Sequence, residues 1–201
     1  MAIPTPSATV GPFFPPHFFG PLDHDLTVKA AGASPARGER IYVFGRIYEP
    51  NRVPRWNVIV ELWQADAGGR FAHPNDPFNA EADPNFMGWG RRWTDKTGFF
   101  DFITVKPGGY DDPLTKTRRA PHLNIALAGS GLMRRLITTL YFPNEAENAA
   151  DPVLAVVPVA RRPLLTLTRV EEDRANAPAG VAAYCLDIVL QGADETPFFV
   201  D

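Results

Sequence analysis

Short apolar runs recur along the chain from residue 39 onward. They are rich in β-branched and aromatic residues, and Gly, Pro, Asn or Asp bounds each run, which is typical of β-strands separated by turns. In the last run Leu186, Ile188 and Leu190 alternate with Asp187 and Val189, as in a half-buried strand. The pattern predicts strands at residues 41–48, 58–64, 99–105, 123–127, 136–142, 164–170 and 184–191.

Helical periodicity is almost absent from the chain. The best helical candidate is the short segment 144–150, and Asp95 to Gly98 is typical of a hairpin turn before a strand that starts at Phe99. Many short strands without regular helices are typical of two sheets packed face to face. We therefore expect an all-β fold, a β-sandwich that spans residues 39–201.

The first 38 residues differ from the rest, because prolines and phenylalanines interleave there. Proline blocks both helices and central strands, so this segment is expected to be extended. Its phenylalanines still need burial, which stabilises by about 1.5–3 kcal/mol each. We predict an N-terminal arm, residues 1–38, that packs across a subunit interface, with packing against its own domain as the alternative.

Composition and charge exclude several classes of protein. The 201 residues are 45% hydrophobic, and the net charge of −3 comes from interspersed acids and bases, unlike the basic footprint of a nucleic-acid binder. No segment approaches the roughly 20 apolar residues that span a membrane, and the N-terminus lacks the pattern of a signal peptide. The single cysteine, Cys185, excludes an internal disulfide framework. We expect a cytoplasmic protein without nucleic-acid or membrane partners.

The run Pro121-His122-Leu123-Asn124-Ile125 carries the candidate chemistry. In a β-strand, side chains alternate between the two faces, so His122 and Asn124 share one face while Leu123 and Ile125 point into a core. With Tyr110 shortly upstream, the polar face resembles half of a metal site. Asn124, however, carries an amide where a metal site would need an imidazole.

Four segments in register resemble the intradiol ring-cleavage dioxygenases. They are residues 61–71 (ELWQADAGGRF), 98–102 (GFFDF), 105–110 (VKPGGY) and 119–125 (RAPHLNI), and the run Thr9-Val10-Gly11-Pro12-Phe13 adds to them. The resemblance implies the β-sandwich of that family. It also implies a reaction in which the ring of a catechol-type aromatic substrate is opened with O₂.

The resemblance further implies a ferric ion held by two tyrosinates and two histidines, since Fe(III) is a hard cation that favours phenolate oxygen supplemented by imidazole. The four ligand positions correspond to Phe71, Tyr110, His122 and Asn124 in this chain. Phe71 has no oxygen, and the neutral amide of Asn124 is a poor ligand for Fe(III). We therefore expect no metal in this chain, with the four positions remaining as vestigial ligand positions.

This pattern is similar to that of the noncatalytic subunit of two-chain members of the family, whose partner subunit binds the Fe(III). The resemblance implies that the arm residues Thr9, Gly11 and Pro12 line the substrate pocket of that partner. An arginine of such subunits, which approaches the substrate, corresponds to Ser130 in this chain. Either Arg134 or Arg135 takes its place, or the partner subunit alone steers the substrate carboxylate. We predict a heterodimer that assembles into higher oligomers, with no catalytic residue in this chain.

Two other functions fit the sequence. The chain could be a self-sufficient intradiol dioxygenase with a changed ligand set, with His73 or an aspartate recruited. It could also be a β-sandwich interaction module that has kept the scaffold of the family. Metal analysis of the isolated chain tests the first alternative, and a neighbouring reading frame with the complete ligand set would argue against the second.

Overall fold

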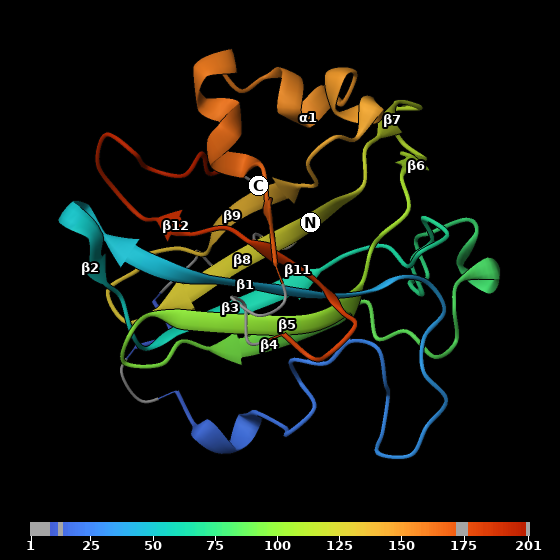
Figure 1. The fold of residues 1–201 in the computed structure, drawn as a ribbon, viewed down its shortest axis with the longest axis horizontal. Helices are drawn as coiled ribbons and strands as arrows, with labels where there is room; N and C mark the ends of the chain where they lie inside the picture. Colours follow the sequence, from blue (N-terminus) through green and yellow to red (C-terminus); the bar gives the residue numbers. More distant parts are fainter. Residues whose placement is uncertain (1–8, 12–13, 172–176, 200–201) are drawn as a thin grey trace, which may run out of the picture.

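The computed structural model describes residues 9–11, 14–171 and 177–199, and two packed β-sheets form its centre (Figure 1). In the six-stranded sheet, β1 (Arg40–Glu49) pairs antiparallel with β5 (Phe99–Val105) and with β2 (Val53–Pro54). The same strand pairs in parallel with β11 (Ala182–Cys185) and β12 (Ile188–Val189), and β10 (Thr168–Val170) extends this sheet beyond β11.

The second sheet has four antiparallel strands in the order β4 (Trp89–Trp93), β3 (Val58–Trp63), β8 (His122–Gly129) and β9 (Leu136–Tyr141). A separate two-stranded ribbon joins β6 (Tyr110–Asp111) to β7 (Arg118–Arg119). The expected all-β sandwich is confirmed. Within the described residues, no helix is long and apolar enough to cross a membrane.

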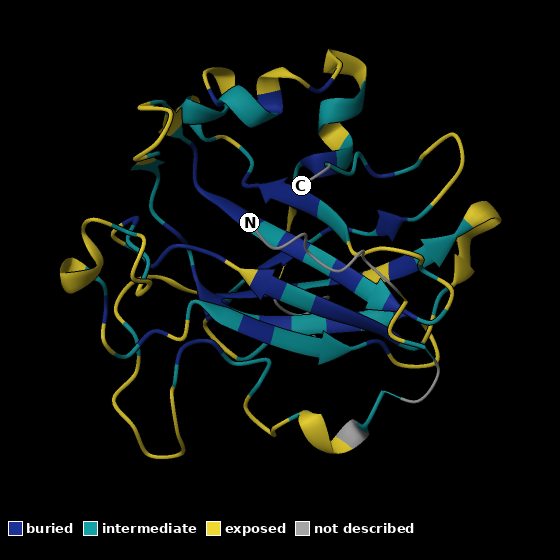
Figure 2. Cartoon of the chain, turned by 180° about the vertical axis from the view of Figure 1, so that it is seen from behind, coloured by how far each residue is buried: buried dark blue, intermediate teal, exposed yellow. Residues whose placement is uncertain are grey.

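Alternating apolar side chains of the two sheets form the core between them, and Figure 2 shows the buried residues concentrated in the central strands. Leu123, Ile125 and Leu127 of β8 are at most 1% exposed and pack in this core, as the alternation predicts. Burying each of these side chains stabilises the fold by about 1.5–3 kcal/mol. The polar residues of β8 consequently lie on the opposite face.

Short helical segments cover that opposite face of β8 and β9, at the top of Figure 1. They are the 3₁₀ helix η4 (Ala146–Ala149), the α-helix α1 (Pro152–Ala155) and the 3₁₀ helix η5 (Val159–Leu165). Leu154, Val157 and Leu165 pack there against Ala120 and Tyr141 in a second apolar cluster. The helical candidate at 144–150 therefore forms a 3₁₀ turn, and the cover itself continues to residue 165.

The structure corrects two of the predicted strands. The run 184–191 is not one strand, because Leu186 and Asp187 interrupt it between β11 and β12, and the Asp187 carboxylate accepts the backbone N–H of Arg46 at 3.0 Å in place of a ladder bond. The run 164–170 is a strand only from Thr168, because η5 extends to Leu165.

The strand β4 was not predicted, since Gly90, Arg91 and Arg92 break any apolar alternation. It forms through its ladder to β3 and through the arm, whose Asp23 accepts both the backbone N–H and the Nε–H of Arg91 at 2.8 Å. A side chain added to Gly90 would meet the backbone of Asp23, so glycine permits this close approach.

The described part of the N-terminal arm lies along the bottom of Figure 1, against β4 and β5. The rings of Phe14 and Phe19 contact Trp93, with centroids 5.8 Å and 5.1 Å away. Leu26 is 1% exposed and belongs to the main core. The helix η1 (Pro16–Phe18) lies on this side, whereas a further 3₁₀ turn, η2 (Pro50–Arg52), joins β1 to β2 at the left of Figure 1. Packing of residues 1–38 across a subunit interface remains a prediction.

Candidate functional site

Two glycine-containing loops bring Phe71 and Tyr110 together. Asp66 holds the first loop, because its Oδ1 accepts the backbone N–H of Gly68 at 2.8 Å and that of Arg70 at 2.9 Å. Gly69 has a φ of +76°, and a side chain there would meet the carbonyl of Gly109 in the second loop. The rings of Phe71 and Tyr110 consequently meet edge-on, with centroids 5.2 Å apart.

The strand β8 presents His122 and Asn124 on the face that points away from the core. The His122 ring lies 5.7 Å from that of Tyr110. Asn124 pairs across the ladders with Trp63 and with Thr139, whose hydroxyl donates to the Asn124 Oδ1 at 3.1 Å. Trp63 in turn stacks on Phe71 at 5.8 Å. The structure thus links the four predicted ligand positions into one cluster.

His122 is buried, at 3% exposure, and neutral. Its Nδ1–H donates to the carbonyl of Ala120 at 2.6 Å, because a carbonyl can only accept, and this leaves the lone pair on Nε2. Burial, reinforced by the positive charge of Arg119, lowers the pKa of His122 from 6.5 to about 4. The imidazole is therefore uncharged throughout the physiological range.

Tyr110 is a protonated phenol. Burial raises the pKa of its hydroxyl, and the positive charge of Arg119 offsets this only in part. Among the described residues none forms a hydrogen bond with the hydroxyl of Tyr110.

A buried ion pair that was not predicted from the sequence lies next to this cluster. Asp151 is fully buried and accepts from Arg119 Nε at 2.9 Å, from the Tyr141 hydroxyl at 2.9 Å and from the Ala120 N–H at 3.0 Å. Despite burial, which raises it, the pKa of Asp151 is lowered overall by its N–H donors and by Arg119. The same bond raises the pKa of Arg119 against the effect of burial.

A sequence signal for this pair existed. Asp151 is the N-cap residue of α1, where its Oδ1 also accepts the backbone N–H groups of Val153 and Leu154 at 3.0 Å. Asp followed by Pro is a recognised helix start. The sequence pattern, however, could not show that the same carboxylate reaches Arg119, 32 residues earlier.

The residues present do not fit a ferric ion. Phe71 offers no donor atom, and the Oδ1 of Asn124 already accepts from Thr139. Across residues 9–11, 14–171 and 177–199, no group of three or more His, Cys, Asp or Glu side chains could hold a metal ion. The guanidinium of Arg119 places a fixed positive charge next to the same site.

The predicted pocket residues lie elsewhere in this chain. The Thr9 hydroxyl donates to the Gly129 carbonyl at 3.0 Å and accepts from the Gly131 N–H at 3.2 Å. These contacts are at the far end of β8, about 23 Å from His122 at ~3.3 Å per residue. Gly11, with a φ of +71°, is described next to Thr9, whereas Pro12 lies outside the described residues.

The arginine positions cluster at the same end of β8. Arg134 is exposed, and it forms no ion pair within the described chain. Arg135 instead pairs with Glu61, and the carbonyl of Ser130 accepts from Arg55. In this single chain, therefore, Thr9 and Arg134 do not approach the cluster around Tyr110.

Two cavities flank the cluster. The first, here called the aromatic cleft, has a volume of about 560 Å³ and opens between the loops that carry Phe71 and Tyr110. The second, of about 570 Å³, lies between β7, β8, β9 and α1, with Arg119, Asn124 and Thr139 in its wall. His122 lines neither of these two cavities. The aromatic cleft is walled by Trp63, Phe71, Asp76, Phe78, Tyr110 and Asp112, among others.

Comparisons with known proteins identify the family of this chain. The chain matches a dioxygenase family model over residues 9–192. It is 41% identical over 185 residues to the protocatechuate 3,4-dioxygenase beta chain of Burkholderia cepacia (89% of this chain, 75% of that one). It is 33% identical over 202 residues to the alpha chain of the same organism's enzyme (97% and 96%).

A solved structure is also similar. The dioxygenase domain of a carbohydrate-binding fusion protein from Streptomyces sp. SirexAA-E superposes with a TM-score of 0.60 at 25% identity, over 95% of this chain and 100% of that domain. The family resemblance of the four sequence segments is thereby confirmed. This chain belongs to the intradiol dioxygenase family.

Proposed function

We propose that this chain is the noncatalytic alpha subunit of a protocatechuate 3,4-dioxygenase. The observation that supports it best is the donor set of the site: Phe71 and Asn124 stand at two of the four expected ligand positions, and neither side chain is a suitable ligand for Fe(III). Sequence identity alone does not separate the two kinds of subunit, because both are homologous to this chain. In this proposal the donor atoms at the four ligand positions therefore separate the two kinds of subunit.

The complete enzyme would open the ring of protocatechuate between its two hydroxyl-bearing carbons. Both atoms of O₂ enter the product, 3-carboxy-cis,cis-muconate. The ferric ion belongs to an iron-binding beta subunit in this proposal, and no step of the reaction runs through the residues of this chain. The enzyme would act in the cytoplasm as an assembly of alpha–beta pairs.

This chain would supply part of the substrate pocket of its partner. The bonds of Thr9 to Gly129 and Gly131 fix the start of the arm on the end of β8. In this proposal Thr9, Gly11 and Pro12 line the substrate pocket of the partner subunit. The exposed Arg134 would bind the carboxylate of protocatechuate through its guanidinium. A planar guanidinium can donate two parallel hydrogen bonds to a carboxylate.

Expression with and without the beta subunit tests the proposal. The chain purified alone should be colourless, free of stoichiometric iron and inactive on protocatechuate. Co-expression with the beta subunit should yield a hetero-oligomer with one iron per alpha–beta pair and ring-cleaving activity. A red, iron-containing chain that cleaves protocatechuate by itself would refute the assignment.

The 41% identity to a beta chain favours one alternative, a self-sufficient dioxygenase that uses Tyr110, His122 and a recruited residue. His73, the candidate recruit, is exposed and its Nδ1 accepts the Asn75 N–H at 3.2 Å. Iron analysis after reconstitution of the chain with Fe(III) decides between the two. If the single variants Tyr110→Phe and His122→Gln each reduced the iron content of the reconstituted chain, this alternative would be supported.

A further inference from the structure

Four aromatic side chains from three segments of the chain contribute to the walls of the aromatic cleft. Trp63 ends β3, Phe71 and Phe78 belong to the loop before the 3₁₀ helix η3 (Asn79–Glu81), and Tyr110 starts β6. The rings of Trp63 and Phe71 are nearly parallel, at 10°. Trp63 is 39% and Phe78 48% exposed. A cleft of about 560 Å³ has the size of a small-molecule site.

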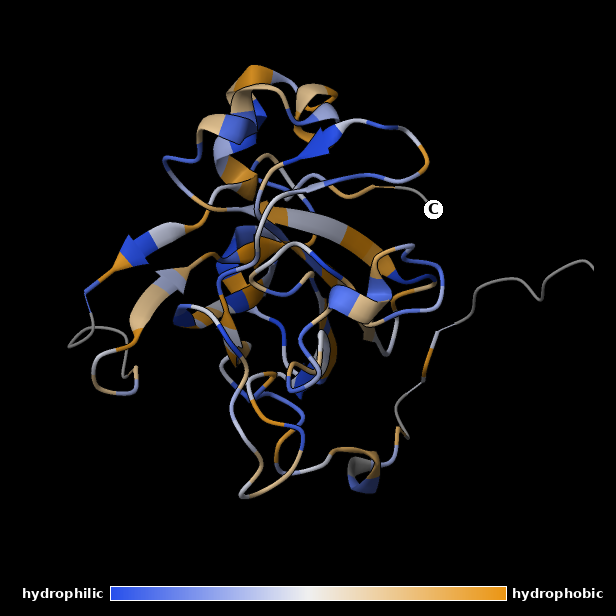
Figure 3. Ribbon diagram, turned by 90° about the vertical axis from the view of Figure 1, so that its right-hand side faces the viewer, coloured by the Kyte–Doolittle hydropathy of each residue, from blue (hydrophilic) through white to orange (hydrophobic). Residues whose placement is uncertain are grey.

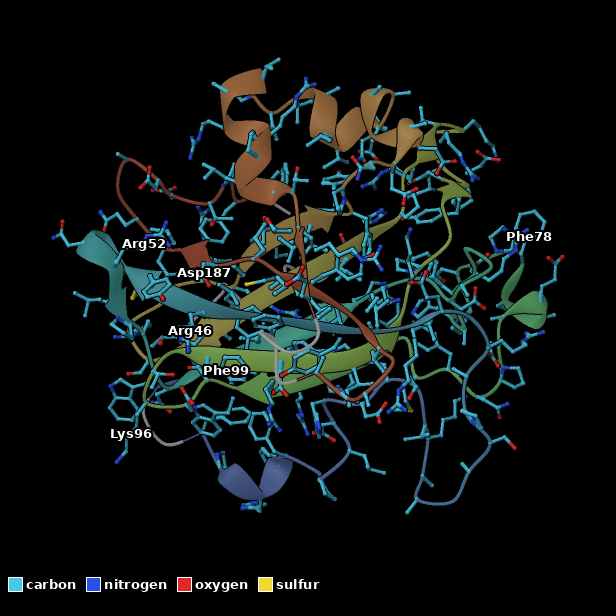
Figure 4. All side chains as sticks on the ribbon, viewed as in Figure 1. Arg46, Arg52, Phe78, Lys96, Phe99 and Asp187 are labelled. Carbon is cyan, nitrogen blue, oxygen red and sulfur yellow. The ribbon has the colours of Figure 1, made fainter. Side chains whose placement is uncertain are left out.

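The cleft lies at the side of the molecule, next to the His122 end of β8, because Tyr110 in its wall is 5.7 Å from the His122 ring. Figure 4 shows Phe78 at the right-hand edge, opposite Arg52 and Asp187. Seen from that edge, hydrophobic and hydrophilic residues alternate along the loops (Figure 3). An exposed aromatic surface with a polar rim is a common mark of a binding site.

Carboxylates outnumber cations around the cleft. Asp76, Asp111 and Asp112 line it, against Arg70 alone. The two oxygens of Asp76 accept backbone N–H groups at 2.8 Å, and Oδ1 of Asp112 accepts two more at 2.8 Å and 2.9 Å. Asp76 and Asp112 form no ion pair within the described chain, while Asp111 lies 3.7 Å from Arg118. The side chains that line the cleft therefore carry more negative than positive formal charge.

One cation already occupies an aromatic face of this cleft. The guanidinium carbon of Arg70 lies 4.7 Å from the ring centroid of Phe78, and its Nε is 3.2 Å from Glu81. A cation over a ring face at this distance is attracted by the negative face of the ring. One aromatic ring of the cleft thus already lies against a positive charge in the folded chain.

We propose that the aromatic cleft binds an organic cation, an ammonium or guanidinium group carried on an apolar body. The aromatic walls would contact the apolar body, and the rings together with Asp76 and Asp112 would attract the charge. An aromatic carboxylate, the substrate class of the proposed enzyme, would be repelled by the same carboxylates. This site is thus distinct in selectivity from the substrate pocket and does not depend on the subunit assignment.

Nuclear magnetic resonance of the full chain tests the proposal. The four tryptophans give four indole N–H signals, of which that of Trp63 reports on the cleft and is assigned with Trp63→Phe. Phenyltrimethylammonium should shift this signal saturably and leave that of Trp56, 59% exposed, unchanged. Benzoate, the same ring with the opposite charge, should bind at least about five-fold more weakly.

Variants at the exposed Phe78 and the half-buried Asp112 separate the contribution of the ring from that of the charge. Phe78→Leu keeps bulk but removes the ring, and should weaken phenyltrimethylammonium binding about two- to five-fold. Asp112→Asn should weaken it as well, and should reduce the preference for the cation over benzoate. Trp56→Leu and Asp194→Asn, changes of the same kind outside the cleft, are the matched controls and should alter nothing.

Two results would overturn the proposal. One is benzoate binding as tightly as phenyltrimethylammonium, and the other is unchanged cation affinity in Phe78→Leu. Addition of the beta subunit identifies the source of the natural cation. Release of the bound ammonium would indicate a lysine or arginine side chain of the partner, and retention would indicate a free small molecule.

Discussion

The two faces of β8 are built by opposite means. On one face Leu123, Ile125 and Leu127 fill the core by size and apolarity alone. On the other, His122 and Asn124 are held by hydrogen bonds, and the ion pair of Arg119 with Asp151 lies behind them. Apolar packing tolerates exchange between residues of similar volume, whereas each polar group in a buried cluster needs its own partner. The absence of metal-ligand atoms at Phe71 and Asn124 thus changes the chemistry of the polar face, while the apolar face of β8 still forms the core.

The largest effect should come from breaking the polar face at its anchor. Asp151→Ala removes the acceptor of Arg119, Tyr141 and Ala120 and leaves a buried guanidinium unpaired. We expect a loss of about 4 kcal/mol in the free energy of unfolding, measured in urea. Asp151→Asn, which keeps an acceptor oxygen, should cost less. A loss under about 1 kcal/mol for Asp151→Ala would mean that water replaces the carboxylate.

The apolar face should respond to a cavity. Leu123→Ala deletes a fully buried side chain and should lower the free energy of unfolding by about 3 kcal/mol. Leu114→Ala, at a position 90% exposed, is the control and should change it by less than about 0.5 kcal/mol. If the two variants proved equally stable, the inward face of β8 would not be the packed core described above.

Acid should weaken the polar face through His122. Its pKa is about 4 in the folded chain and 6.5 ordinarily, so below pH 6.5 the unfolded state takes up a proton that the folded state refuses. The contribution of neutral His122 to the free energy of unfolding is intact above pH 6.5. It is lost as the pH falls toward 4, at up to about 1.4 kcal/mol per pH unit. Unfolding curves at pH 7, 6 and 5 should show this slope, and His122→Gln should flatten it.

The smallest effect should come from the exposed neighbour of the buried pair. Arg118 forms an ion pair with Glu147 at 2.8 Å, but both side chains are partly exposed to solvent. The exposed fraction is 46% for Arg118 and 35% for Glu147. Arg118→Gln should therefore cost about 0.5 kcal/mol or less, and added salt should abolish the difference. A cost comparable to that of Asp151→Ala would show that burial does not separate the two pairs.

Much of the site could be predicted from the sequence, because it rests on local rules. Strand alternation placed His122 and Asn124 on one face, and the family resemblance of residues 61–71 and 105–110 indicated Phe71 and Tyr110 as the other two ligand positions. Three features could not be predicted: the strand β4, the break at Leu186 and Asp187, and the helical cover from η4 to η5. Each depends on a partner distant in the chain, as β4 depends on Asp23 of the arm.

The sequence by itself determined which donor atoms this chain can offer, since Phe71 has no oxygen and Asn124 no imidazole in any fold. It also determined the strand period, and with it the two faces of β8. Only the tertiary structure decided the charge and protonation of the site. The pKa values of Tyr110 and His122 depend on burial under the helical cover and on the distance to Arg119, and no local pattern encodes either quantity.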